Sequence, residues 1–486
     1  MIPSLILVTV MIHTMNTQST PSSIPIPAVA TIAGAPPAFG PLPSARQIRW
    51  HAMESCMFIH FGVNTFTGAE WGGGKENPTL FNPTKLDCLQ WARAAKDAGL
   101  RGIIITAKHH DGFCLWPSAV TEHSVKSSPW RDGKGDVLRE LSAACRAEGL
   151  AFGVYLSPWD RNNPKYGSGE AYNEYFASQL KDVLSNYGEV SEVWFDGACG
   201  EGPDGRKQVY DFPKFIDVVR TCQPGACIFS DGGPDVRWVG NESGFGSETN
   251  WSRMNAKEFF PGVTGRNDDL EHGQRDGTDW LPAEVDVSIR PGWFWRAAED
   301  DRVKSPQTLE KIWFESVGRG CNLLLNIPVD SRGLVAPQEL ASLKEWGNLQ
   351  RAMFAVDFAP KAQVSATSTR LAPSTSAFAA ANVTDGNPAT YWATDDAVTS
   401  GTLEFLFPSA ISPRVIRIEE AIQLGQRVDA FHVELRGSDG VWRKTVQGTT
   451  IGVRRILRLE GEGVNGVRVV IDESRACPCI SRVSIY

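Results

Sequence analysis

The chain has 486 residues, a net charge of −8 and 42% hydrophobic residues. This length exceeds what one compact core normally supports, so it predicts two domains with flanking segments. Sixteen tryptophans and 23 phenylalanines argue against a disordered chain. Acidic and basic residues are interspersed without a basic stripe, which argues against a nucleic-acid partner and favours a neutral, sugar-like ligand.

The N-terminal part of the chain has the pattern of a leader. An apolar run at 2–12 is followed by a stretch rich in Thr, Ser, Pro and Ala up to about residue 44. Although the positively charged start of a secretory signal is missing, we expect residues 1–44 to be a signal peptide and linker, and the protein to be exported to the periplasm or the extracellular space. A misassigned start codon is the alternative. No other run reaches the roughly 18 apolar residues that span a bilayer, so no membrane partner is expected.

From residue 57 onward, short apolar runs alternate with amphipathic helical segments. Helical spacing is clearest at 176–187, and the segments 136–149 and 305–318 follow the same pattern with capping residues at their starts. The apolar runs lie at 57–62, 102–108, 151–158, 192–197, 226–231 and 322–328. Alternation of this kind predicts a parallel sheet that is covered by helices on both faces.

We expect a seventh strand at 284–289 and leave one strand unassigned. Together with the six units, these strands predict an α/β fold with a (β/α)₈-like barrel over residues 45–357. A doubly wound open sheet is the alternative, but no G-x-G-x-x-G follows the first run. Residues 240–282 show no regular pattern, and we expect a long active-site loop there. After about residue 358, short alternating runs separated by turn residues predict an all-β sandwich over 358–486.

The active site of such a barrel lies at the carboxyl ends of the strands, so polar residues that close the apolar runs are the candidates. Asp196 follows a buried-looking run and precedes a glycine, and we interpret it as a catalytic nucleophile. Its alternative role is a helix cap or a turn. The other residues in this position are His60, His109, His110, Asp111, Tyr155, Asp160 and Asp231.

Many aromatic residues accompany these polar groups. Aromatic faces stack on the C–H groups of a sugar while His, Asp and Glu bind its hydroxyls, so with paired carboxylates they indicate glycoside hydrolysis. The aromatic candidates are Phe58, Trp71, Phe113, Trp116, Tyr155, Trp159, Trp194, Trp293 and Trp295.

Two other interpretations stay open. A metal-dependent barrel hydrolase is less favoured, because no H-x-H pair is present and the adjacent His109 and His110 cannot both point at one ion from a regular strand. We therefore assign no metal ligands in the barrel. A carbohydrate-binding protein with an inactive barrel is the second alternative.

Several long motifs resemble glycoside hydrolase family 29, the retaining α-L-fucosidases, over about residues 46–335. The last motif resembles the subfamily that is selective for α-1,3/1,4-linked fucose on branched, Lewis-type glycans. The motifs are HFG at 60–62, NTF at 64–66, EW at 70–71, KHHDGF at 108–113, YLSPWD at 155–160, WFDG at 194–197 and GPDVRWVGNE at 233–242.

By this resemblance Asp196 is the nucleophile and Glu242 the general acid/base, with Glu70, Glu248 and Glu284 as rivals for the second role. The resemblance also implies that no cofactor is needed and that the partners are fucosylated oligosaccharides or glycoconjugates. The residues implied to hold the fucose hydroxyls are His60, Glu70, Trp71, His109, His110 and Tyr155. Those implied to form a wall for the C6 methyl group are Phe58, Trp194 and Trp293.

The segment 381–392 in the second domain resembles discoidin-like modules, the factor 5/8 type C family, many of which bind sugars. The resemblance leaves open whether this domain binds carbohydrate or only packs on the barrel. It also implies a structural calcium ion bound by carbonyl groups around Asp385.

Overall fold

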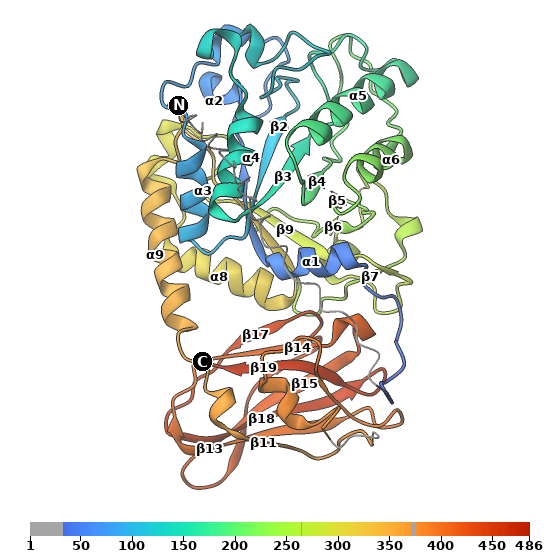
Figure 1. Ribbon diagram of the computed structural model, residues 1–486, viewed down its shortest axis with the longest axis vertical. Coiled ribbons are helices and arrows are strands. Elements are labelled where there is room, and N and C mark those ends of the chain that lie inside the picture. The colour runs from blue at the N-terminus through green and yellow to red at the C-terminus, as the bar shows by residue number, and fades with distance from the viewer. Residues whose placement is uncertain (1–32, 264, 372–375) are drawn as a thin grey trace, which may run out of the picture.

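The computed structural model describes residues 33–263, 265–371 and 376–486, so most of the expected leader lies outside the described residues. Eight parallel strands form a closed barrel in the order β1-β10-β9-β6-β5-β4-β3-β2 (Figure 1). The strands are β1 (Ser55–Ile59), β2 (Gly102–Lys108), β3 (Ala151–Leu156), β4 (Glu192–Trp194), β5 (Cys227–Ser230), β6 (Val236–Trp238), β9 (Ala283–Ser288) and β10 (Asn322–Asn326). The predicted (β/α)₈-like barrel is confirmed.

Helices cover the outside of the barrel, and their apolar faces pack on the strands in one continuous core. In the described ranges no helix is long and apolar enough to cross a bilayer. The helices are α1 (Ala45–Met53), α2 (Asn64–Thr67), α3 (Cys88–Asp97), α4 (Val137–Glu148), α5 (Glu170–Asn186), α6 (Phe212–Cys222), α7 (Asn267–His272), α8 (Pro306–Ser316) and α9 (Pro337–Met353).

The strand that the sequence left unassigned is β6. It has only three residues, and the segment 231–235 joins it to β5 without an intervening helix. The following segment, 240–282, is not a loop throughout. It contains α7 and a short antiparallel pair, β7 (Arg253–Met254) with β8 (Asp279–Trp280).

Helix α1 lies across the amino-terminal mouth of the barrel. Ser44 and Gln47 form a capping box at its start. The Gln47 side chain also donates hydrogen bonds to the carbonyl oxygens of Asp235 at 2.8 Å and Trp280 at 2.9 Å. Trp50 on the same helix extends into the cluster that fills the barrel interior. Residues outside the strands therefore close this end.

The C-terminal domain consists of two antiparallel sheets with an apolar core between them, which confirms the predicted all-β domain. One sheet has the order β11-β13-β18-β15-β16 and the other β12-β19-β14-β17. The strands are β11 (Gln363–Ala366), β12 (Trp392–Ala393), β13 (Gly401–Ile411), β14 (Val415–Glu420), β15 (Val428–Arg436), β16 (Trp442–Gly448), β17 (Arg455–Arg458), β18 (Val464–Ser474) and β19 (Cys479–Ile485).

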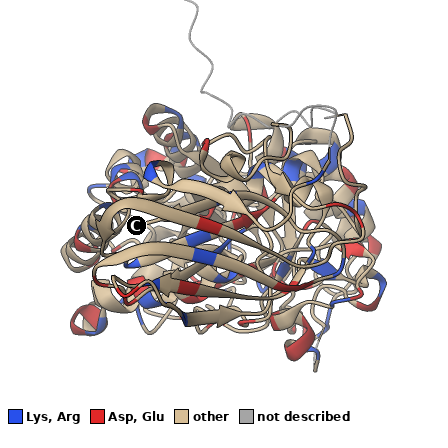
Figure 2. Cartoon of the chain, turned by 90° about the horizontal axis from the view of Figure 1, so that it is seen from below, with Lys and Arg blue, Asp and Glu red and all other residues tan. Residues whose placement is uncertain are grey.

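Arginines of the C-terminal domain bind the amino-terminal end of the barrel. Arg417 pairs with Glu54, which precedes β1, over 2.5 Å. The buried Arg454 donates to the carbonyl oxygens of His51 and of Cys321, the residue before β10. The sandwich therefore sits beneath this end (Figure 1), and the carboxyl ends of the strands point away from it. Charged residues of both signs are interspersed in the view from below (Figure 2).

Candidate active site

Asp196 follows β4 and reaches the carboxyl-terminal mouth of the barrel. Because side chains alternate along a strand, Glu192, Trp194 and Asp196 all point into the barrel. Asp196 Oδ2 accepts a hydrogen bond from the Tyr155 hydroxyl at 3.0 Å, and Oδ1 accepts one from the backbone N–H of Ala198 at 2.7 Å. Two donors thus hold this carboxylate in one orientation.

Three buried histidines lie beside Asp196. His110 Nε2 is 3.8 Å from Asp196 Oδ2, and the His109 ring lies between those of His60 and His110, with centroid distances of 5.4 and 4.1 Å. Burial lowers the pKa of each histidine, that of His60 to about 3, so all three imidazoles are neutral near pH 7. A neutral imidazole can donate with one nitrogen and accept with the other, which suits sugar hydroxyls.

Hydrogen bonds from the end of β10 and from the end of β3 orient two of these rings. His60 Nδ1 lies 2.9 Å from Asn326 Oδ1, and His110 Nδ1 lies 2.7 Å from Ser157 Oγ. His109 Nδ1 is buried without a hydrogen-bond partner among the described residues. A buried nitrogen without a partner needs an explanation, and at the mouth of the barrel a ligand hydroxyl group would supply one.

Aromatic rings form one wall of the site. Trp194 stacks on Phe229 and on Tyr155, with centroid distances of 3.8 and 5.4 Å. Phe58 lies 5.5 Å from Trp194 and 6.3 Å from Trp293. The predicted residues Phe58, Trp194 and Trp293 therefore lie together, as an apolar wall requires.

The loop after α2 supplies Glu70 and Trp71 at the rim. Glu70 accepts a hydrogen bond from the backbone N–H of Trp293 and pairs with Arg296. Trp71 is 54% exposed, and the edges of its ring meet His110 and Trp159. Trp71 thus lies at the entrance, farther from the barrel interior than the histidines.

Glu242 lies on the loop after β6, at the surface of the rim. Its neighbours desolvate the carboxyl group, which raises its pKa. A hydrogen bond from the Trp293 side chain lowers the pKa, whereas the charges of Asp196 and Glu70 raise it further. The charge of Asp196 thus acts on Glu242, which is consistent with both carboxyl groups lying at the carboxyl-terminal mouth of the barrel.

The other two candidates for the general acid/base, Glu248 and Glu284, lie in different environments. The Glu248 side chain is exposed, and its carbonyl oxygen accepts hydrogen bonds from Thr449 and Arg455 of the C-terminal domain. Glu284 is buried inside the barrel, where it accepts a hydrogen bond from the Trp194 indole. Of the four glutamates, Glu70 and Glu242 are therefore the ones at the rim beside Asp196.

Sequence reasoning missed two residues of this region. Asp286 on β9 is buried and accepts a hydrogen bond from the Trp238 indole at 2.8 Å; burial and the nearby Glu242 raise its pKa well above the usual range. Asn326 at the end of β10 binds His60 and Ser288. The strand-end criterion could have identified Asn326, since it is the polar residue near the end of the last apolar run, 322–328.

Asp231, which the strand-end criterion selected, lies behind the nucleophile. It accepts a hydrogen bond from the backbone N–H of Gly262, and burial raises its pKa to about 6, with a further contribution from the charge of Asp196. Asp111 and Asp160 are buried in polar contacts with Asn64 and Lys108, respectively. Both therefore support neighbouring loops.

Across the described residues, no group of three His, Cys, Asp or Glu side chains could hold a metal ion. Near the predicted calcium site, the two carboxylate oxygens of Asp385 accept hydrogen bonds from the Asn387 backbone N–H and the Thr390 hydroxyl. Both carboxylate oxygens of Asp385 therefore stabilise the turn, and a structural calcium ion held by the carbonyl groups around Asp385 stays a prediction.

The site combines a fixed carboxylate, a second carboxyl group of raised pKa, neutral histidines and an aromatic wall, as glycoside hydrolysis requires. A sequence profile described as "Alpha-L-fucosidase" matches residues 45–352. "Alpha-L-fucosidase 1" of Arabidopsis thaliana is 44% identical over 448 residues, which cover 92% of this chain and 87% of that protein.

A relative from Oryza sativa subsp. japonica, "Putative alpha-L-fucosidase 1", is also 44% identical, over 92% of this chain and 85% of its own length. Among solved structures, a Ruminococcus gnavus GH29 fucosidase in complex with fucose is 33% identical, with a TM-score of 0.85 over 94% of this chain and 97% of that one. The profile, the relatives and the barrel agree, and the chain therefore belongs to the glycoside hydrolase family 29 of α-L-fucosidases.

Proposed function

We propose that this enzyme is a retaining exo-α-L-fucosidase that removes terminal α-1,3/1,4-linked fucose from branched, Lewis-type glycans. The observation that carries the proposal is the Asp196 carboxylate, which Tyr155 and Ala198 hold at the mouth of the barrel. Glu242, whose pKa is raised at the same site, is the proposed partner. A retaining site needs one carboxylate that attacks and one carboxylic acid that donates a proton.

In the first step, an Asp196 oxygen bonds to the anomeric carbon as the bond from that carbon to the leaving oxygen breaks. The Glu242 proton moves to the leaving oxygen, so the aglycone departs as an alcohol and a covalent fucosyl-enzyme forms. The raised pKa of Glu242 favours the protonated form that the first step needs.

In the second step, the Glu242 carboxylate takes a proton from water as the water oxygen attacks the anomeric carbon. The bond from this carbon to Asp196 breaks, the nucleophile regains its charge, and Glu242 is again protonated. Two inversions give net retention, so the first sugar released is the α anomer.

The proposed fucose site uses the neutral histidines for the hydroxyl groups and the aromatic wall for the C6 methyl group. His109 Nδ1, buried and unpaired among the residues described, is available for a hydroxyl group. The fucose bound by the Ruminococcus gnavus relative supports this sugar. The α-1,3/1,4 preference rests on the motif at 233–242, whose last residue is Glu242.

The test compares a Lewis-type α-1,3/1,4-fucosylated oligosaccharide with an α-1,2-fucosylated one, with free fucose as the readout. Wild type should cut the first substrate and leave the second intact, and early ¹H NMR spectra should show α-fucose. Asp196→Ala should abolish turnover. Azide should rescue Glu242→Ala on an activated fucoside, whereas Glu248→Gln, the matched control, should behave like wild type.

Other outcomes would refute individual parts of the proposal. Release of β-fucose first would refute retention, and cleavage of the α-1,2 substrate would refute the linkage preference. Release of no fucose from either glycan by the wild type would favour the carbohydrate-binding alternative.

For the C-terminal domain we propose a discoidin-like module that binds glycans, with support from the motif at 381–392 and the two-sheet architecture. Glycan-array binding by an Asp196→Ala variant, with competition by free fucose to separate the two sites, tests this role.

We also propose export, supported by the apolar run at 2–12. Fractionation of the source cells followed by N-terminal sequencing tests it.

A further inference from the structure

Two glutamates lie buried inside the barrel, and the proposed mechanism uses neither of them. Glu192 begins β4 and is 0% exposed, and Glu284 is on β9 and is 2% exposed. Glu192 Oε2 accepts a hydrogen bond from Trp50 Nε1, and Glu284 Oε2 accepts one from Trp194 Nε1, each at 3.0 Å. The two carboxyl groups lie close enough inside the barrel for each to change the pKa of the other. We call them the Glu192–Glu284 pair.

This pair must hold at least one proton. Neither glutamate forms a salt bridge to a described cationic side chain, since both known partners are neutral indoles. Burial raises the pKa of both groups, and the charge of Glu192 raises that of Glu284 further. Two unpaired carboxylates in an apolar interior would be strongly destabilising.

The pair is linked to the active site through Trp194. The indole N–H of Trp194 is fixed by Glu284, and its ring stacks on Tyr155, whose hydroxyl donates to Asp196. We propose that the Glu192–Glu284 pair, with at least one proton bound, is a positioning device that holds Trp194 against the fucose and, through Tyr155, orients the nucleophile. This inference rests on the proposed roles of Trp194 and Asp196.

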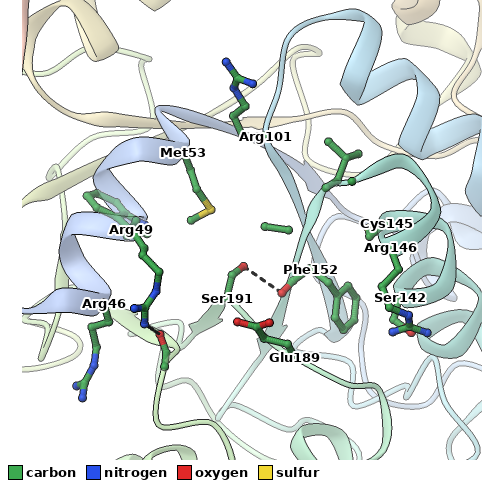
Figure 3. Close-up of a pocket in the computed structure, with 15 residues that line it drawn as sticks. Arg46, Arg49, Met53, Arg101, Ser142, Cys145, Arg146, Phe152, Glu189 and Ser191 are labelled. Atoms are coloured by element: carbon green, nitrogen blue, oxygen red, sulfur yellow. Dashed lines mark hydrogen bonds between the residues drawn. The ribbon is translucent and has the colours of Figure 1, made fainter. Parts of the chain in front are cut away.

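Trp50 separates the pair from solvent at the amino-terminal mouth. A cleft of about 210 Å³ opens there, and its lining includes Trp50, Met53, Phe152 and Ser191 (Figure 3). Trp50 is 1% exposed, and its indole covers Glu192 on the side toward this cleft. Trp50 thus lies between Glu192 and this cleft.

The test replaces Glu284 by two side chains of similar length. Glu284→Gln keeps an acceptor for Trp194 and a donor for Glu192, so kcat/KM for the fucoside should stay within threefold of wild type. Glu284→Met leaves the Trp194 N–H buried without a partner, so kcat/KM should fall at least tenfold, mainly through KM. Equal activity of the Met variant and wild type, or equal losses in both variants, would overturn the proposal.

A second measurement needs no turnover. In protein labelled with ¹⁵N-tryptophan, the indole resonances of Trp50 and Trp194 are assigned from Trp→Phe variants and followed from pH 5 to 9. The pair should show at most one titration step, because one proton stays bound, and Glu192→Gln should remove that step. Two steps would mean full ionisation and would overturn the bound proton. This titration is recorded without substrate, whereas the proposed function is tested by the turnover of Asp196→Ala. A failure of the proposed function can therefore be told apart from a failure of this inference.

Discussion

The Tyr155 hydroxyl donates to Asp196 Oδ2 over 3.0 Å and connects the end of β3 to the proposed nucleophile. Burial and the negative charge of Asp196 raise the pKa of Tyr155 well above its usual value, so the phenol remains a neutral donor at any working pH. The hydrogen bond therefore persists throughout the pH range in which the enzyme can be measured.

Tyr155→Phe should lower kcat/KM by about ten- to a hundredfold, because hydrogen bonds to charged groups contribute about 1.5–3 kcal/mol. Tyr187→Phe is the matched control: this buried tyrosine donates to Asp136 at 3.1 Å, away from the barrel mouth. Steady-state kinetics on both variants measure the difference. If both keep wild-type kcat/KM, Tyr155 does not orient the nucleophile.

Glu70→Gln should shift the alkaline limb of the kcat/KM profile to lower pH. The negative charge of Glu70 raises the pKa of Glu242, so its removal lowers that pKa, and the general acid loses its proton at a lower pH. Glu248→Gln, on the side facing the C-terminal domain, should leave the limb in place. An unchanged limb in Glu70→Gln would mean that Glu242 is not the group that titrates.

Gly197→Ala should remove most activity. A Cβ atom at this position would lie 1.9 Å from Asp231 Oδ2 and 2.5 Å from the Gly262 nitrogen, so the backbone beside Asp196 must move. A shift of about 1 Å in a catalytic group can cost a hundredfold in rate. Gly437→Ala in the C-terminal domain, where the nearest atom is 3.3 Å away, is the control. Wild-type kcat in Gly197→Ala would show that the loop adapts.

Glu54→Gln should lower thermal stability more at neutral pH than at pH 3. Burial alone would raise the pKa of Glu54. The positive charges of Arg417 and Arg454 outweigh burial and lower this pKa to about 2. A depressed pKa stabilises the folded state above the unfolded value of about 4.5, and this contribution is lost as pH falls toward 2. Melting temperatures at pH 3, 5 and 7 measure it, with the exposed Glu345→Gln as control. A constant difference across this range would contradict the ion-pair explanation.

The barrel could be predicted because its strands are continuous apolar runs and most helices between them have 3.6-residue spacing. The same reasoning placed His60, His109, His110, Tyr155 and Asp196 at one mouth, where the structure has them. It failed for β6, because a three-residue strand without a preceding helix has no periodicity to detect.

The sequence by itself determined seven of the eight barrel strands in chain order, the change to a β domain near residue 358 and the polar residues at most strand ends. These features depend on local periodicity and on residues close together in the chain. Only the tertiary structure decided which side chains meet, such as Glu192 with Glu284, Trp238 with Asp286 and His60 with Asn326. The tertiary structure also decided the pKa changes at Glu242 and the histidines, because burial and nearby charges depend on contacts between residues far apart in the chain.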